Sequence, residues 1–180
     1  MRAFIAIDLP ESVKDAISDL QADLPTGQPS PSENLHLTLA FLGEQPTEMI
    51  EDIHTALCDL TAPGFDLQLA GTDTFGGNDP KVVFAAVKPN PALEHLHRKI
   101  RSLAHGAGFV LDRQRFRPHV TIARFRRRPT APEMERLRGW LLAHSNFGTE
   151  PFPVTEISLY RSTLSRAGAF HDELARYPLG

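Results

Sequence analysis

Two segments of the sequence carry the same short pattern, a histidine and a threonine separated by one apolar residue. The first pair is His36 and Thr38, and the second is His119 and Thr121. Both segments are apolar enough to form strands, in which alternate residues share a face. With a rise of about 3.3 Å per residue, each histidine lies roughly 6.6 Å along the strand from its threonine, on the same side.

Histidine and threonine at this spacing suit acid–base chemistry on a phosphate group. If the two strands lie side by side about a pseudo-two-fold axis, two imidazoles and two hydroxyls converge on one tetrahedral centre. An imidazole takes up or releases a proton near neutral pH, and hydroxyls donate to the non-bridging oxygens. This arrangement suits hydrolysis of a cyclic phosphodiester, in which a base deprotonates water and an acid protonates the departing sugar oxygen. Such chemistry requires no metal ion.

The pattern is informative because it occurs twice. One His-x-Thr strand is common by chance, and a strand histidine is more often a structural hydrogen-bonding residue. Two copies with matching apolar neighbours, each in a half of similar layout, favour the catalytic interpretation.

Positive charge is concentrated near the second motif. The net charge of the chain is −3, which indicates no general affinity for polyanions. Between positions 113 and 128, however, there are seven arginines and no acidic residue. The cluster is equally compatible with an anion-binding surface and with a solvated face whose arginines pair with acids elsewhere.

The remaining sequence predicts the elements that position these residues. Apolar periodicity and turn residues predict strands over 2–8, 35–42, 65–70, 81–87, 109–125 (broken at Pro118), 154–164 and 169–176. They predict helices over about 8–24, 47–60, 91–105 and 131–142, the first two capped by Asp8 and Thr47. Each half of the chain thus contains a helix, a His-x-Thr strand, a second helix and a strand pair. We predict an α+β chain with an internal duplication, forming one domain over 1–180 in which the two halves pack as lobes.

The composition of the sequence indicates the cellular compartment in which the protein is expected. No apolar run approaches the roughly 18 residues that span a bilayer, and Asp8 and Pro10 interrupt the N-terminal stretch too early for a signal peptide. The single cysteine, Cys58, excludes an internal disulfide and fits a reducing compartment. The expected location is the cytoplasm, without membrane association, and we expect Cys58 to be buried on its helix.

At the residues described above, the chain resembles the two-histidine (2H) phosphoesterase superfamily, and within it the LigT-like RNA 2′,3′-cyclic phosphodiesterases. The likeness covers nearly the whole chain and is carried by residues 4–10, 33–43, 116–124, 157–162 and 174–179. It implies a bilobal α+β fold with duplicated lobes, an antiparallel sheet in each lobe, helices outside, and a basic active-site cleft between the lobes.

The resemblance also implies residue roles. It implies that His36 and His119 form the catalytic pair. It also implies that Thr38, Thr121 and Arg124 bind the phosphate. By analogy, His36 is the general acid on the 3′ oxygen and His119 the general base on water, although a near-symmetric site leaves the reverse open. Arg117 and Arg126 are candidate RNA contacts. No metal or other cofactor is implied.

Three other features bear on the site. Many relatives carry an Arg-Trp pair shortly before the first motif, whereas residues 27–32 contain neither residue type. Phe41 shares the strand face of Leu37 and Leu39, so strict alternation predicts core packing rather than stacking on a base. His171 lies on the last predicted strand and could approach the cleft, but a surface position is the prediction.

These observations predict hydrolysis of RNA 2′,3′-cyclic phosphate ends to 2′-phosphomonoesters, with possible reverse 2′,5′ ligation by the same groups. The expected partners are RNA with such ends or short cyclic-phosphate nucleotides, and the expected state is a monomer. The alternatives are a phosphodiesterase for small cyclic nucleotides, a catalytically silent RNA-binding module and a metal-dependent hydrolase. The intact motifs argue against the silent module, since a pure binder needs no paired acid–base groups.

Overall fold

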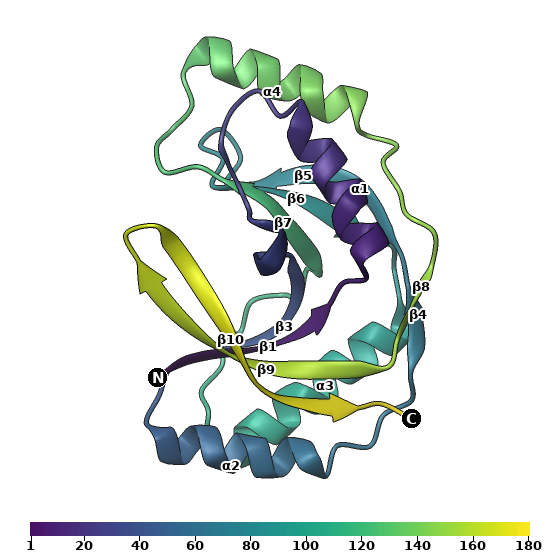
Figure 1. Ribbon diagram of the computed structural model, residues 1–180, viewed down its shortest axis with the longest axis vertical. Coiled ribbons are helices and arrows are strands. Elements are labelled where there is room, and N and C mark those ends of the chain that lie inside the picture. Colours follow the sequence, from purple (N-terminus) through teal and green to yellow (C-terminus); the bar gives the residue numbers. More distant parts are fainter.

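A computed structural model describes all residues, 1–180, and its central feature is one continuous antiparallel sheet (Figure 1). The strands follow the order β10 (Gly168–Pro178), β9 (Glu156–Ser165), β1 (Arg2–Asp8), β3 (His36–Glu44), β7 (His119–Arg124), β6 (Val82–Val87) and β5 (Leu69–Phe75). The short strand β2 (Gln28–Pro29) pairs with β7, while β4 (Phe65–Leu67) and β8 (Phe152–Val154) form a separate two-stranded sheet. The helices are α1 (Glu11–Ala22), α2 (Thr47–Cys58), α3 (Pro91–Gly106) and α4 (Ala131–Ala143), with a 3-10 turn at Ser32–Asn34.

The sheet divides into two lobes at the junction of β3 and β7. A single residue pair, Leu37 with Val120, joins these two strands. On one side of the junction lie β10, β9, β1 and β3 with helices α2 and α3, and on the other lie β7, β6 and β5 with α1 and α4 (Figure 1). Each lobe therefore contains an antiparallel sheet flanked by helices, which confirms the predicted α+β class.

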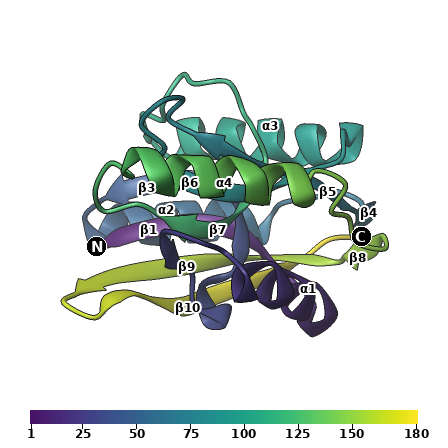
Figure 2. The same cartoon turned by 90° about the horizontal axis from the view of Figure 1, so that it is seen from above.

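The lobes differ from the sequence halves that the periodicity predicted. The β5–β6 hairpin follows α2 in the chain, yet it pairs with β7 of the second half. The β9–β10 hairpin follows α4, yet it pairs with β1 of the first half. Figure 2 shows the latter hairpin as a long arm along one side of the molecule. Each lobe thus takes strands from both halves, because each hairpin covers a sheet edge that the other half would otherwise leave unpaired.

Several local predictions also need correction. Helices α1 and α2 begin after Pro10 and Pro46, whose φ values of −58° and −59° suit a helix start, and neither helix has a side-chain cap. Asp8 and Thr47 are therefore not capping residues. The strand predicted over 109–125 forms only at His119–Arg124, directly after Pro118.

Cys58 was predicted to be buried, but it is exposed at the end of α2, because its neighbour Leu57 is the residue that faces the core.

A single hydrophobic cluster of 37 buried residues runs through the molecule. None of the helices is long and apolar enough to cross a membrane.

Candidate active site

The two His-x-Thr motifs lie on adjacent strands at the centre of the sheet. Leu37 of β3 pairs with Val120 of β7, and both side chains are completely buried. The histidine and threonine on either side of each buried residue point to the opposite face, where they are half-buried. The strand pairing thus brings the four predicted residues to one face, at the junction of the lobes.

Each motif strand carries a bulge directly after its threonine. The β1–β3 register shifts at Leu39, and the β6–β7 register shifts at Ile122. As a result, two consecutive residues are buried in each strand, and the next side chain turns back to the site face. That side chain is Phe41 in β3 and Arg124 in β7. The prediction that Phe41 packs in the core is wrong, since it is 61% exposed.

His36 lies in an aromatic environment. Its ring stacks on Phe4, with centroids 4.8 Å apart, and meets the ring of His171 edge-on at 5.4 Å. Burial and, to a lesser extent, a charge on His171 lower the pKa of His36 to about 4, against the opposing effect of the Asp8 carboxylate across the strand pair. The free enzyme therefore holds His36 as neutral imidazole at pH 7.

His119 is oriented by its own backbone. Its Nδ1 lies 2.8 Å from the carbonyl oxygen of Arg117. Because a carbonyl only accepts, Nδ1 carries the hydrogen, and the neutral ring keeps its free lone pair on Nε2. Phe75 and Phe84 meet the ring edge-on, and burial lowers the pKa of His119.

Arginine charge lies close to both histidines. Arg124 lowers the pKa of both catalytic imidazoles, which places its charge near each of them. Burial and the nearby Arg2 lower the pKa of Arg124 itself. Of the seven arginines between 113 and 128, only Arg127 pairs with a carboxylate, that of Glu133 at 2.8 Å. The anion-binding interpretation of this cluster is therefore favoured over a face neutralised by acids.

The other two predicted arginines occupy different positions. The guanidinium of Arg117 lies over the ring of Phe75, 4.8 Å from its centroid. Arg126 lines a hollow of about 180 Å³ together with Arg124 and Gln28. Gln28 pairs with Arg124 through β2, so the stretch that lacks the Arg-Trp pair lies directly beside the predicted phosphate ligand.

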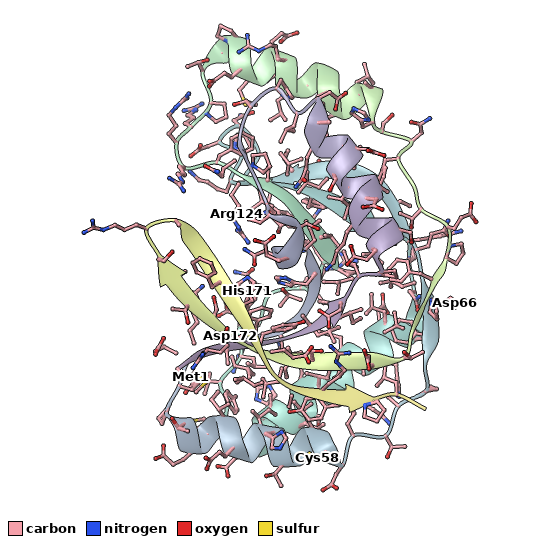
Figure 3. All side chains as sticks on the ribbon, viewed as in Figure 1. Met1, Cys58, Asp66, Arg124, His171 and Asp172 are labelled. Carbon is pink, nitrogen blue, oxygen red and sulfur yellow. The ribbon has the colours of Figure 1, made fainter.

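His171 belongs to the site, contrary to the prediction of a surface position. It is half-buried against Phe4 and His36, and its Nδ1 is buried without a hydrogen-bond partner. Figure 3 shows His171 and Arg124 close together between the β9–β10 hairpin and β7. Sequence spacing offered no indication of this position, because it depends on where the hairpin pairs.

Metal ligands are not grouped in this structure. Nowhere do three or more histidine, cysteine, aspartate or glutamate side chains converge as a metal site would require.

Comparison with known proteins agrees with this geometry. The model of the 2′-5′ RNA ligase superfamily matches residues 9–166. This chain belongs to that superfamily. The RNA 2′,3′-cyclic phosphodiesterase of Geobacillus stearothermophilus is 34% identical over 183 residues, covering 98% of this chain and 56% of that protein. The protein of the same name from Escherichia coli K12 is 30% identical, with 99% and 96% covered.

A protein of known structure has the same fold. The crystal structure of E. coli LigT complexed with 3′-AMP superimposes with a TM-score of 0.78 at 29% identity, covering 99% of this chain and 97% of LigT. The likeness thus extends over the whole chain, including both motif strands and the β9–β10 hairpin.

Proposed function

We propose that this chain hydrolyses RNA 2′,3′-cyclic phosphate ends to 2′-phosphomonoesters, with His36 and His119 as the catalytic pair. The observation that carries the proposal is the convergence of two imidazoles and two threonine hydroxyls on one face of adjacent strands, beside unpaired arginines. Similarity to enzymes named RNA 2′,3′-cyclic phosphodiesterase supports the substrate class.

In the proposed reaction, water attacks phosphorus opposite the 3′ oxygen. One imidazole accepts a proton from the water, the P–O3′ bond breaks, and the other imidazole donates a proton to the departing 3′ oxygen. Thr38 and Thr121 donate hydrogen bonds to the non-bridging oxygens, where negative charge accumulates. Arg124 neutralises the same charge. The product keeps its phosphate on the 2′ oxygen.

We assign the acid role to His36 and the base role to His119. The neutral His119, with its hydrogen on Nδ1, presents Nε2 as a proton acceptor. Asp8 is the carboxylate that favours the charged form of His36, whereas burial opposes it. The bound phosphate, an anion beside His36, supplies the further stabilisation that the imidazolium needs.

The same groups serve the reverse reaction, joining RNA ends through a 2′,5′ linkage, which the superfamily description names.

Both histidines and both threonines come from one chain, so the site requires no second subunit and we expect a monomer. The single cysteine supports a cytoplasmic location. Sedimentation of the purified protein tests the first expectation, and cell fractionation tests the second.

The direct test is an RNA oligonucleotide ending in 2′,3′-cyclic phosphate, incubated with the protein in excess chelator, beside His36→Ala and His119→Ala. We expect a 2′-phosphate product from the wild type and a fall of roughly 10²- to 10⁴-fold in each variant. RNA binding without turnover would favour a silent binding module instead. Loss of activity with chelator would indicate a metal-dependent enzyme.

A further inference from the structure

A row of three polar side chains crosses adjacent strands beside the catalytic centre. It consists of Arg2 on β1, Ser162 on β9 and His171 on β10, and we refer to these residues as the Arg2 row. Ser162 pairs with His171, and Ala3 pairs with Arg161, which places Arg2 beside Ser162. Because neighbouring strands lie about 4.8 Å apart, the three side chains form one short line.

The Arg2 row lies on the face of the sheet that carries the catalytic residues. His171 meets the rings of Phe4 and His36 edge-on, with centroids 4.9 Å and 5.4 Å apart. Ser162 shares the face of its strand partner His171, and Arg2 shares the face of Phe4, which lies two residues further along β1. The row therefore borders His36.

The donors of the row are free to bind an anion. Its three side chains make no hydrogen bond or ion pair within the chain, and Nδ1 of His171 is buried without a partner. The nearest carboxylates have other partners. Glu44, opposite Arg2 in the strand pair, binds the N-terminal amine at 2.9 Å, and Asp172 binds Arg161 at 2.8 Å.

The charge of Arg2 acts across this part of the site. Burial is the main reason that the pKa values of Arg124 and His171 are lowered, and the charge of Arg2 contributes to both shifts. Arg2 and Arg124 are thus two positive groups in one region. In the proposed reaction Arg124 neutralises the reacting phosphate, which leaves Arg2 for a second anion.

The other end of the same face is acidic, and its groups already have partners. The Tyr160 hydroxyl donates to Asp8, and the Ser158 hydroxyl lies 3.0 Å from Asp8 and 3.1 Å from Glu173. Two carboxylates repel a further anion at that end, whereas the Arg2 row attracts one.

We propose that the Arg2 row binds the phosphodiester on the 5′ side of the terminal nucleotide. The inference rests on the proposed function. Because His36 protonates the 3′ oxygen, the terminal ribose lies on the His36 side of the reacting phosphorus, and the RNA chain leaves the site on that side. The next anion along the chain is the flanking phosphodiester, and the Arg2 row is the set of free donors that borders His36. The enzyme therefore favours RNA ends over cyclic mononucleotides.

The test compares two dinucleotides that differ in one charge. Both are ApA ending in a 2′,3′-cyclic phosphate. The first has an ordinary phosphodiester between its nucleosides, and the second has a methylphosphonate, which keeps the linkage but removes its negative charge. We expect the wild type to favour the phosphodiester substrate in kcat/KM on the order of tenfold, as for a charged hydrogen bond.

Variants of the row and of its neighbour assign this preference. Arg2→Gln removes the charge but keeps a polar side chain, so the preference should disappear, and in Ser162→Ala it should fall partly. Arg2→Lys keeps the charge and should retain most of the preference. Arg161→Gln is the matched control, because it makes the same charge change on the opposite face of β9 and should leave the preference intact.

The outcomes separate the two proposals. A wild type that cleaves neither dinucleotide contradicts the proposed function, and the subsite falls with it. A wild type that cleaves both equally well overturns the subsite alone. A preference that survives Arg2→Gln also overturns it, since the phosphodiester would then be bound elsewhere. Equal losses of preference in Arg2→Gln and Arg161→Gln would indicate long-range attraction rather than a subsite.

Discussion

The imidazole of His171 meets that of His36 edge to face, with ring centroids 5.4 Å apart and an interplanar angle of 82°. The contact joins residues 135 positions apart in sequence, on β10 and β3, and places a third titratable ring beside the catalytic pair. A charge on His171 makes protonation of His36 less favourable, so the two rings influence each other's titration.

Replacing His171 by phenylalanine should therefore change the pH dependence of the reaction. The substitution keeps a ring of similar size but removes the charge that lowers the pKa of His36, so that pKa should rise toward its ordinary value. We expect the limb of the kcat/KM profile that belongs to His36 to move to higher pH. His95→Phe, on the exposed face of α3, is the control. Superimposable profiles for His171→Phe and wild type would show that His171 only fills space.

The wild-type profile should itself be displaced to low pH. Burial lowers the pKa of both His36 and His119 below 6.5. The base must be neutral, which it is above its pKa, and the acid must be protonated, which it is below its pKa. Activity of the free enzyme is thus maximal between two values that both lie below 6.5. A kcat/KM optimum above pH 7 on a cyclic mononucleotide would contradict this account.

The threonine hydroxyls should contribute equally, as the pseudo-symmetry requires. Valine has the shape of threonine without the hydroxyl, so Thr38→Val and Thr121→Val each remove one hydrogen-bond donor from the non-bridging oxygens. We expect each kcat to fall roughly 10²-fold, as for loss of one oxyanion donor. Thr163→Val, on the exposed part of β9, serves as the control. A fall in one variant only would show that the phosphate lies nearer one strand.

Arg124 should matter more than other arginines of the basic region. It is unpaired and acts on both catalytic histidines, so Arg124→Gln removes a charged contact to phosphate worth about 1.5–3 kcal/mol. This corresponds to a loss of roughly ten- to a hundredfold in kcat/KM. Arg136→Gln, on the exposed surface of α4, changes net charge equally and should have no such effect. Equal losses in both variants would indicate long-range attraction rather than contact.

Leu37 should be decisive for stability, because it forms the residue pair that joins the two lobes. Its side chain is completely buried, and Leu37→Ala leaves a cavity at the junction. We expect the free energy of unfolding to fall by about 2–5 kcal/mol, measured by denaturant titration. Leu164→Ala, at a position 66% exposed on β9, should change it little. A loss in Leu37→Ala no greater than in the control would mean that the lobes are joined elsewhere.

Much of the architecture follows from local pattern. Apolar periodicity and turn residues identified α3 and α4 to within one residue, and the matching His-x-Thr patterns identified both motif strands. These features depend on the spacing of neighbouring residues, which the sequence contains directly. The resemblance carried by the same residues pointed to the superfamily.

The sequence by itself thus determined the α+β class, the two motif strands and the residue types that could act on a phosphate. Only the tertiary structure decided which hairpin joins which lobe, that a bulge turns Phe41 out of the core, and that His171 lies against His36. Each of these depends on contacts between segments far apart in the chain. Local periodicity shows which face of an element is apolar, but packing of the whole molecule determines which other element covers that face.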